Sequence, residues 1–258
     1  MGIIKKIIFS ICLLSINFYA YSESVFTYDI KKDMVLGTLS LGLFASPFFI
    51  DNIPENVPTG LVKQDVNAFD RNLMFSYHKP LDVVSDYGVY ALLALPVLSL
   101  TGNYTEKEAW LTYGIMYAEA FLLTFGTKDL LKNAIVRYRP YVYDGGIPAG
   151  QENDYYNSFP SGSTALAFLS AGFLSATFSA EYPYSPRKIP IIAGAYTLST
   201  GVASLRIVSG AHFLTDVITG AAIGSLYGWI IPLLHKKQSN SDIAVNITGN
   251  GIVMSFRF

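Results

Sequence analysis

The stretch Ser204–Asp216 reads S-L-R-I-V-S-G-A-H-F-L-T-D and carries the strongly polar Arg206, His212 and Asp216 among apolar and small residues. His212 and Asp216 are four residues apart, so on a helix they share a face and the carboxylate can accept a hydrogen bond from the imidazole. Such a bond fixes the tautomer and leaves the other ring nitrogen available as a base or nucleophile. Gly210 permits a turn that brings Arg206 back toward the ring as an anion holder. A buried His–Asp pair without a chemical role fits this stretch equally well.

The composition of the chain bounds the class of protein. The 258 residues are 51% hydrophobic and 14% charged, with a formal net charge of -1. This balance indicates one domain that is either associated with a membrane or built on a very apolar helical core. A near-neutral chain argues against nucleic acid as a partner, because phosphate binding normally requires a basic balance.

The first 22 residues have the pattern of an export signal. Lys5 and Lys6 precede an apolar core over Ile7–Tyr19, and Ala20-Tyr21-Ser22 supplies the small residues read at a cleavage site. We therefore expect a signal peptide at 1–22, a helical domain at 23–235 and a tail at 236–258. The alternative is an uncleaved anchor. The only cysteine, Cys12, lies in the apolar core, so the processed chain would have no disulfide and no thiolate metal site.

Six apolar segments predict an all-α bundle of six main helices with small-residue faces suited to close packing. Most segments are near the lower length limit for crossing a bilayer, so a membrane-spanning bundle and a periplasmic globule both remain possible. The tail alternates weakly over 243–258, which favours strand or a docked extension. The helical segments are 34–50, 83–100, 109–139, 164–180, 189–205 and 213–234.

Two further stretches complete a candidate site for an oxyanion. Lys132 and Arg139 are seven residues apart, which is two helical turns, so a continuous helix presents both cations on one face. The run Phe159-Pro160-Ser161-Gly162-Ser163 has the form of a helix start, where backbone N–H groups are free and glycine lets an anion approach. Each feature alone is common.

The ordered patterns K-x6-R-P, P-S-G and R-x5-H-x3-D resemble the type 2 phosphatidic acid phosphatase (PAP2) superfamily, which is shared with vanadium haloperoxidases. The resemblance implies a six-helix PAP2-type bundle and a phosphatase that needs no metal or cofactor. It implies that His212 attacks phosphorus to form a phosphohistidine while Asp216 holds its ring. It also implies that phosphate is bound by Lys132, Arg139, Ser161, the Gly162 amide and Arg206.

The sequence departs from this family at Ser163, where the pattern normally has a histidine that acts as general acid. Such proton transfer typically contributes about 10²–10⁴ in rate. We therefore expect an envelope phosphatase acting on a lipid phosphate, a diphosphate or a small phosphate ester. It would be periplasmic or membrane-associated in a bacterium. The alternative is a weakened or inactive protein that binds phosphate or a lipid headgroup. A haloperoxidase or a purely structural bundle fits the residues less well.

Overall fold

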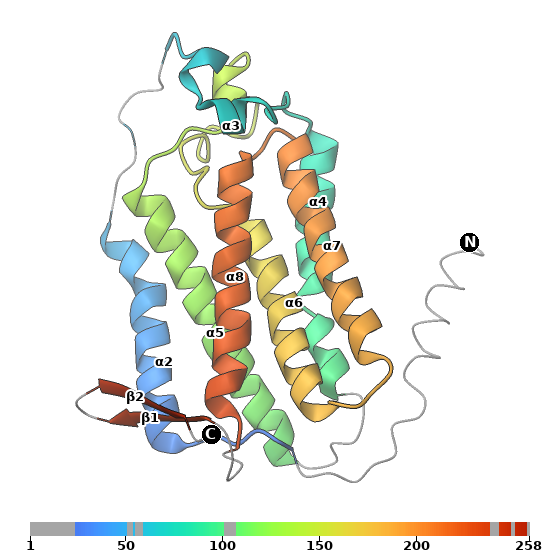
Figure 1. The fold of residues 1–258 in the computed structure, drawn as a ribbon. Coiled ribbons are helices and arrows are strands. Elements are labelled where there is room, and N and C mark those ends of the chain that lie inside the picture. The colour runs from blue at the N-terminus through green and yellow to red at the C-terminus, as the bar shows by residue number, and fades with distance from the viewer. Residues whose placement is uncertain are drawn as a thin grey trace.

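The computed structural model describes residues 24–50, 54, 59–100, 107–237, 243–248 and 251–256. The predicted signal peptide lies outside them. Six long helices stand side by side (Figure 1), which confirms the predicted all-α bundle. They are α2 (Ile30–Ala45), α4 (Lys79–Leu92), α5 (Lys107–Ala134), α6 (Gly162–Glu181), α7 (Lys188–Val208) and α8 (Leu214–His235).

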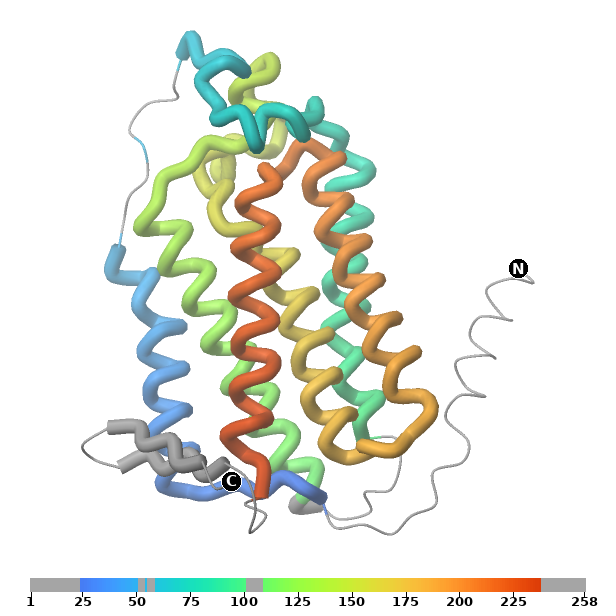
Figure 2. The backbone as a smooth tube through the Cα atoms, in the orientation of Figure 1, coloured from blue at the N-terminus to red at the C-terminus, as the bar shows by residue number. Residues whose placement is uncertain are grey.

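The helices alternate in direction, so their connections gather at the two ends of the bundle. The segments 59–78 and 135–161 lie together over the upper end (Figure 2). They include the short helix α3 (Ala68–Arg71) and a 3₁₀ turn at Pro140–Tyr143. At the lower end, β1 (Ile243–Thr248) and β2 (Gly251–Phe256) form an antiparallel hairpin. The predicted site residues lie at the upper end, because they are carried by the ends of α5 and α7, the starts of α6 and α8, and the 135–161 segment.

Helices α6 and α8 pack closely because α8 places glycine on the face that meets α6. Gly220, Gly224 and Gly228 recur every fourth residue, so they lie on one face of the helix. A Cβ atom at Gly224 would lie 2.0 Å from the carbonyl oxygen of Ala165 on α6. The backbones can approach only because side chains are missing there. This contact holds the start of α6 against the start of α8.

Two predicted helices end earlier than their sequence pattern suggests. Helix α4 ends at Leu92 and is followed by a 3₁₀ segment at Leu95–Leu100. Helix α5 ends at Ala134, whereas the pattern predicted continuation to Arg139. The backbone of Arg137 instead pairs with the 156–158 segment, accepting from Ser158 N at 2.9 Å and donating to Tyr156 O at 3.1 Å. This pairing straightens the chain beyond α5.

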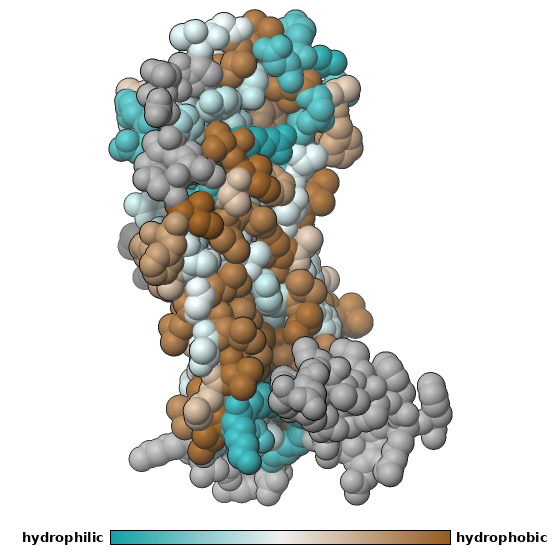
Figure 3. Space-filling model, turned by 90° about the vertical axis from the view of Figure 1, so that its left-hand side faces the viewer, coloured by the Kyte–Doolittle hydropathy of each residue, from teal (hydrophilic) through white to brown (hydrophobic). Residues whose placement is uncertain are grey.

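One face of the bundle is apolar at the middle of its height (Figure 3). Figure 3 shows a mainly brown belt between teal regions at the upper and lower ends. Four of the described helical segments are long and apolar enough to cross a membrane, judged by length and composition. They are Lys79–Leu100, Gly162–Glu181, Lys188–Val208 and Leu214–His235.

Candidate active site

His212 lies in the bend that joins α7 to α8, not on a helix as the four-residue spacing suggested. The bend depends on Gly210, whose φ is +69° and whose Cβ position would lie 2.6 Å from the carbonyl oxygen of Phe75. A side chain there would therefore meet both backbone strain and a steric clash. Across the bend, His212 N donates to the carbonyl oxygen of Arg206 at 3.1 Å.

The imidazole of His212 is held by a backbone carbonyl. Its Nδ1 lies 2.7 Å from the carbonyl oxygen of Ser158, which can only accept, so Nδ1 carries the proton. Nε2 is then left with a lone pair. The predicted partner, Asp216, has its Oδ2 3.7 Å from Nδ1, which is too long for a hydrogen bond. The imidazole therefore has its Nδ1–H bonded and its Nε2 free, as predicted, but the acceptor is the Ser158 carbonyl and not Asp216.

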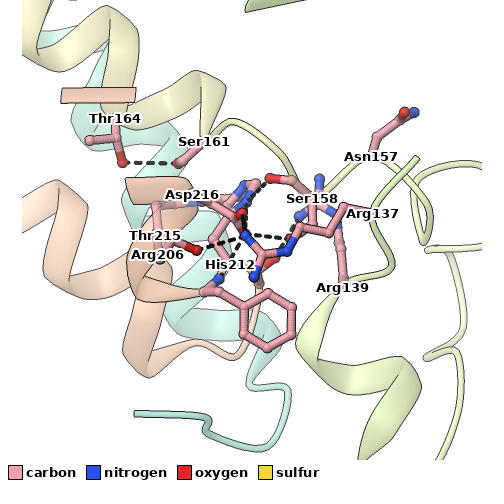
Figure 4. A network of polar contacts seen from close by, with 12 residues as sticks. Arg137, Arg139, Asn157, Ser158, Ser161, Thr164, Arg206, His212, Thr215 and Asp216 are labelled. Atoms are coloured by element: carbon pink, nitrogen blue, oxygen red, sulfur yellow. Dashed lines mark hydrogen bonds and ion pairs between the residues drawn. The ribbon is translucent and has the colours of Figure 1, made fainter. Parts of the chain in front are cut away.

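Asp216 instead organises the segments around the histidine, as Figure 4 shows. Its Oδ2 accepts from Ser158 Oγ at 2.6 Å and from Phe213 N at 2.9 Å. The second bond caps the start of α8, where backbone N–H groups lack partners within the helix. Its Oδ1 pairs with Arg137. Asp216 therefore fixes Ser158, whose carbonyl in turn fixes His212.

Arg137 extends this network to α3. Its Nη2 lies 2.6 Å from Oδ2 of Asp70, and its Nη1 donates to Thr215 Oγ1 at 2.7 Å. Asp70 is fully buried and also accepts from Thr215 N at 2.9 Å. Because Asp70 and Asp216 share one guanidinium, the 59–78 segment is fastened to the first turn of α8.

The three predicted phosphate-binding cations all reach the upper end of the bundle. Lys132 donates to the carbonyl oxygen of Asn157. Arg139 is buried, donates from Nε to the Asp154 carbonyl at 2.9 Å and pairs with the Asp154 carboxylate. Lys132 and Arg139 do not share a face of one helix as predicted, because Arg139 lies beyond the end of α5.

Arg206 is held from α4 by acidic side chains. Its Nη1 lies 2.5 Å from Asp82 Oδ1 and 3.0 Å from Asp86 Oδ1, and it donates to Ser85 Oγ at 2.9 Å. Its Nε is buried and has no hydrogen-bond acceptor among the described residues. The guanidinium is therefore fixed in place while one donor stays available for an anion.

The predicted helix start is confirmed as the first turn of α6. Ser161 is the N-cap residue and is fully buried, with its Oγ 2.9 Å from Thr164 Oγ1. A Cβ atom at Gly162 would lie 3.0 Å from the side chain of Lys128, so glycine lets this cation approach. Ser163 follows, and its Oγ donates to Asp86 Oδ1 at 3.2 Å.

The surroundings of His212 disfavour the protonated form of its imidazole. Burial, followed by the positive charges of Arg139, Arg206 and Lys132, holds the pKa of His212 well below its usual value of 6.5. The imidazole is therefore neutral at neutral pH. A neutral ring with Nδ1 protonated presents Nε2 as a nucleophile or base.

Several residues of the site were not anticipated from the sequence. Lys128 could have been found, because it lies one helical turn before Lys132 on the same face. The others gave no signal of their own, since each is identified by a partner that lies well away in the chain. They are Asp70, Asp82, Asp86, Arg137, Asp154 and Ser158.

The amino-acid sequence of this chain matches a known family. The profile of the PAP2 superfamily matches residues 110–240, about half of the chain. The protein therefore belongs to the PAP2 superfamily.

Two bacterial relatives are similar to this chain in sequence. A lipid A 1-phosphatase of Porphyromonas gingivalis is 28% identical over 224 residues, covering 84% of this chain and 43% of that protein. The chain thus spans less than half the length of this relative. A phosphatidylglycerophosphatase B of Bacillus subtilis is 27% identical over 149 residues, covering 57% of this chain and 68% of that protein.

Two solved structures are also similar. LpxE of Aquifex aeolicus has 24% identity and a TM-score of 0.41, covering 67% of this chain and 99% of its own. The PAP2-type phosphatidylglycerolphosphate phosphatase of Bacillus subtilis has 23% identity and a TM-score of 0.47, covering 81% and 98%.

Proposed function

We propose that this protein is a lipid phosphate phosphatase of the bacterial envelope that works through a phosphohistidine at His212. The observation that carries this proposal is the state of the imidazole. The Ser158 carbonyl oxygen lies 2.7 Å from Nδ1 and accepts its N–H, and burial together with the surrounding cations holds the pKa of His212 low. Nε2 is therefore a neutral nucleophile placed where positive charge would attract a phosphate.

The proposed reaction has two displacements at phosphorus. Nε2 of His212 attacks in line, a P–N bond forms, and the bond to the ester oxygen breaks with its electron pair leaving on that oxygen. Water then attacks phosphorus and releases His212 and inorganic phosphate. The spreading charge on the phosphoryl oxygens would be met by Lys132, Arg139 and Arg206, together with the Gly162 amide at the start of α6. These groups use no metal or cofactor.

Asp216 has a positioning role in this mechanism. Since its carboxylate binds Ser158 Oγ and Arg137, it would keep the Ser158 carbonyl in place as His212 changes partners during the reaction. The Oδ2–Nδ1 distance of 3.7 Å still allows its charge to stabilise a positively charged phosphohistidine. Ser161 would support the turn that carries the Gly162 amide.

The substrate class follows from the relatives and the surface. Both bacterial relatives are named for phosphatase activity on phosphorylated lipids, and the bundle has an apolar middle with four segments able to cross a membrane. A site at one end of such a bundle would meet lipid headgroups at the membrane surface. A lipid phosphate or diphosphate fits best, and a small phosphate ester has the same reacting group.

A second reading is favoured by Ser163. The side chains of the other two histidines make no contact with the site residues described above, since His78 is exposed at the start of α4 and His235 ends α8. A leaving alkoxide would therefore lack the proton donor found in the family. The alternative is a protein that binds phosphate or a headgroup and turns over slowly or not at all.

Phosphate release from lipid phosphates and diphosphates in mixed micelles tests the proposal. We expect release by the wild type and only background release by His212→Ala. His78→Ala, which removes an exposed imidazole at the same end of the bundle, should match the wild type. Acid-labile phosphate on the wild-type chain, absent from His212→Ala, would report the intermediate. Equal release by wild type and His212→Ala would refute the proposal, whereas vanadate binding without any release would support the binding-only alternative.

A further inference from the structure

Three titratable side chains meet at the lower end of the bundle, away from His212. They are Asp33 in the first turn of α2, Glu119 in α5 and His235 at the end of α8. His235 is fully buried and Glu119 is 4% exposed. Nε2 of His235 lies 3.0 Å from Asp33 Oδ1 and 3.5 Å from Glu119 Oε2. Helix α8 has 22 residues, so about 33 Å separate this cluster from the phosphatase site.

Each side chain is oriented by a bond on its far side. Nδ1 of His235 lies 2.9 Å from the carbonyl oxygen of Ile231, so it carries the proton and Nε2 presents a lone pair. Oδ2 of Asp33 accepts from Asp29 N at 2.9 Å, which turns Oδ1 toward His235. Outer partners that fix the tautomer and the carboxylate in this way are typical of metal ligands.

The inward-facing atoms have no hydrogen-bond donor. Asp33 Oδ1, both carboxylate oxygens of Glu119 and His235 Nε2 all lack a partner within the described residues. The nearby Lys32 donates its Nζ to the carbonyl oxygen of Leu234 at 2.7 Å. Buried polar atoms are normally satisfied, so several facing acceptors point to a cation between them.

A proton accounts for this cluster only in part. A proton on Nε2 would bridge His235 to Asp33, but both oxygens of Glu119 would still lack a donor. A divalent cation would give both carboxylates and the neutral imidazole a positively charged partner. The Glu119 carboxylate could bind such a cation through one or both of its oxygens.

The types of ligand select the class of cation, and the distances are compatible with it. Zinc binds imidazole nitrogen and carboxylate oxygen at about 2.0–2.2 Å, which places two donors of a tetrahedral site about 3.4 Å apart. The observed separations of 3.0 and 3.5 Å fit such an ion with slight contraction. Imidazole favours a first-row transition metal over Mg²⁺ or Ca²⁺, whose ligands are oxygens. We propose that Asp33, Glu119 and His235 bind one divalent transition metal ion, with Zn²⁺ as the best match.

The proposed ion would fasten α2 to the rest of the domain. Glu119 and His235 lie within the family-matched region at 110–240, whereas Asp33 precedes it. Backbone bonds already join these parts, with Thr27 N donating to His235 O at 3.0 Å and Lys237 N donating to Val25 O at 2.8 Å. A metal there would be structural, and the chemistry at His212 would not pass through it.

Metal content and thermal unfolding of the purified full-length chain in detergent test this site. We expect about one zinc per chain before chelation and none after dialysis against EDTA. Returning ZnCl₂ at a hundredfold excess over its dissociation constant should raise the Tm by roughly 5–10 °C, and MgCl₂ should not. Glu119→Gln should lose the response. Glu181→Gln should keep it, because that carboxylate lies at the same end of the bundle but binds Ser24 and Tyr113.

Cobalt gives a readout that does not depend on stability. The chelated wild type with CoCl₂ should develop the visible absorption of a four- or five-coordinate Co²⁺ ion, and Zn²⁺ should displace it. Asp33→Asn provides a second ligand variant should Glu119→Gln fail to fold. The proposal is overturned if the wild type neither retains nor rebinds metal, because a shared proton then explains the cluster. An equal zinc response in wild type and a folded ligand variant would also overturn it.

Discussion

Replacing Ser163 by histidine would supply the general acid that the proposed phosphatase site lacks. Ser163 is the second residue of α6, directly after Gly162. Its Oγ lies 3.2 Å from Asp86 Oδ1, and the side chain of Asp86 is 49% exposed. An imidazole at this position would therefore extend toward solvent beside a carboxylate that can accept its N–H. Asp86 would orient the ring while the other nitrogen faces the departing oxygen.

The expected gain in kcat follows from the rate contribution of general-acid catalysis. A positioned general acid is worth about 10²–10⁴ in rate, which corresponds to about 3–5 kcal/mol of activation free energy. We expect Ser163→His to raise kcat by this factor on a lipid alkyl phosphate, whose alkoxide needs a proton. On 4-nitrophenyl phosphate the gain should be small, because the aryl oxide leaves without one. The ratio of the two gains is therefore the diagnostic quantity.

Matched variants separate proton transfer from other consequences of the substitution. Ser163→Ala should behave like the wild type, since a hydroxyl does not titrate near neutral pH. Ser163→His should give a smaller gain in an Asp86→Asn background than it gives over the wild type, because the amide orients the ring less well. Adding His212→Ala should abolish activity. Steady-state rates of phosphate release on both substrates, with vanadate inhibition as a measure of an intact site, provide the data. Equal gains on the two substrates, or no gain with unchanged vanadate inhibition, would refute the reasoning.

Three further outcomes can be checked independently. Gly224→Ala should lower the free energy of unfolding by about 1–3 kcal/mol through overpacking, whereas Gly201→Ala on α7, where no atom lies within 4 Å, should be neutral or stabilising in thermal unfolding. Because the pKa of His212 is lowered on folding, stability should fall as pH drops below about 6.5; a flat wild-type profile, or an equal decline in His212→Gln, would contradict this. A cysteine introduced into the 141–159 loop of a Cys12→Ser chain should react with an impermeant thiol reagent in intact cells. Labelling only after lysis would contradict an outward-facing site.

Much of the fold could be predicted because helix formation leaves a local signal. The apolar segments and their polar breaks located all six long helices, and α6 was expected from 164 to 180 against the observed Gly162–Glu181. The end of α5 could not be located in this way. Its pattern continues to Arg139, but the chain leaves the helix where the backbone of Arg137 binds the 156–158 segment. That competing bond involves residues about twenty positions away and is invisible in a local window.

In the site, too, local sequence patterns predicted some residues, whereas long-range contacts determined others. The motif grouped Lys132, Arg139, Arg206 and His212, and in the structure the three cations lie close enough to His212 to lower its pKa. The residues that position them are chosen by the packing of distant segments. Asp82 reaches Arg206 across 124 positions, and Asp70 reaches Arg137 across 67. Sequence alone offers no means of pairing these charges.

The predicted His–Asp bond failed for a physical reason that also clarifies the role of Asp216. An i, i+4 pair meets only if both residues lie on one helix, and the positive φ of Gly210 ends α7 so that His212 stays in the bend. Asp216 is then free to cap α8 through Phe213 N and to hold Ser158. Its hydrogen-bonding influence on the imidazole therefore passes through the Ser158 carbonyl. The Ser158 carbonyl accepts a hydrogen bond from Nδ1–H and cannot donate one, so the lone pair of the ring stays on Nε2.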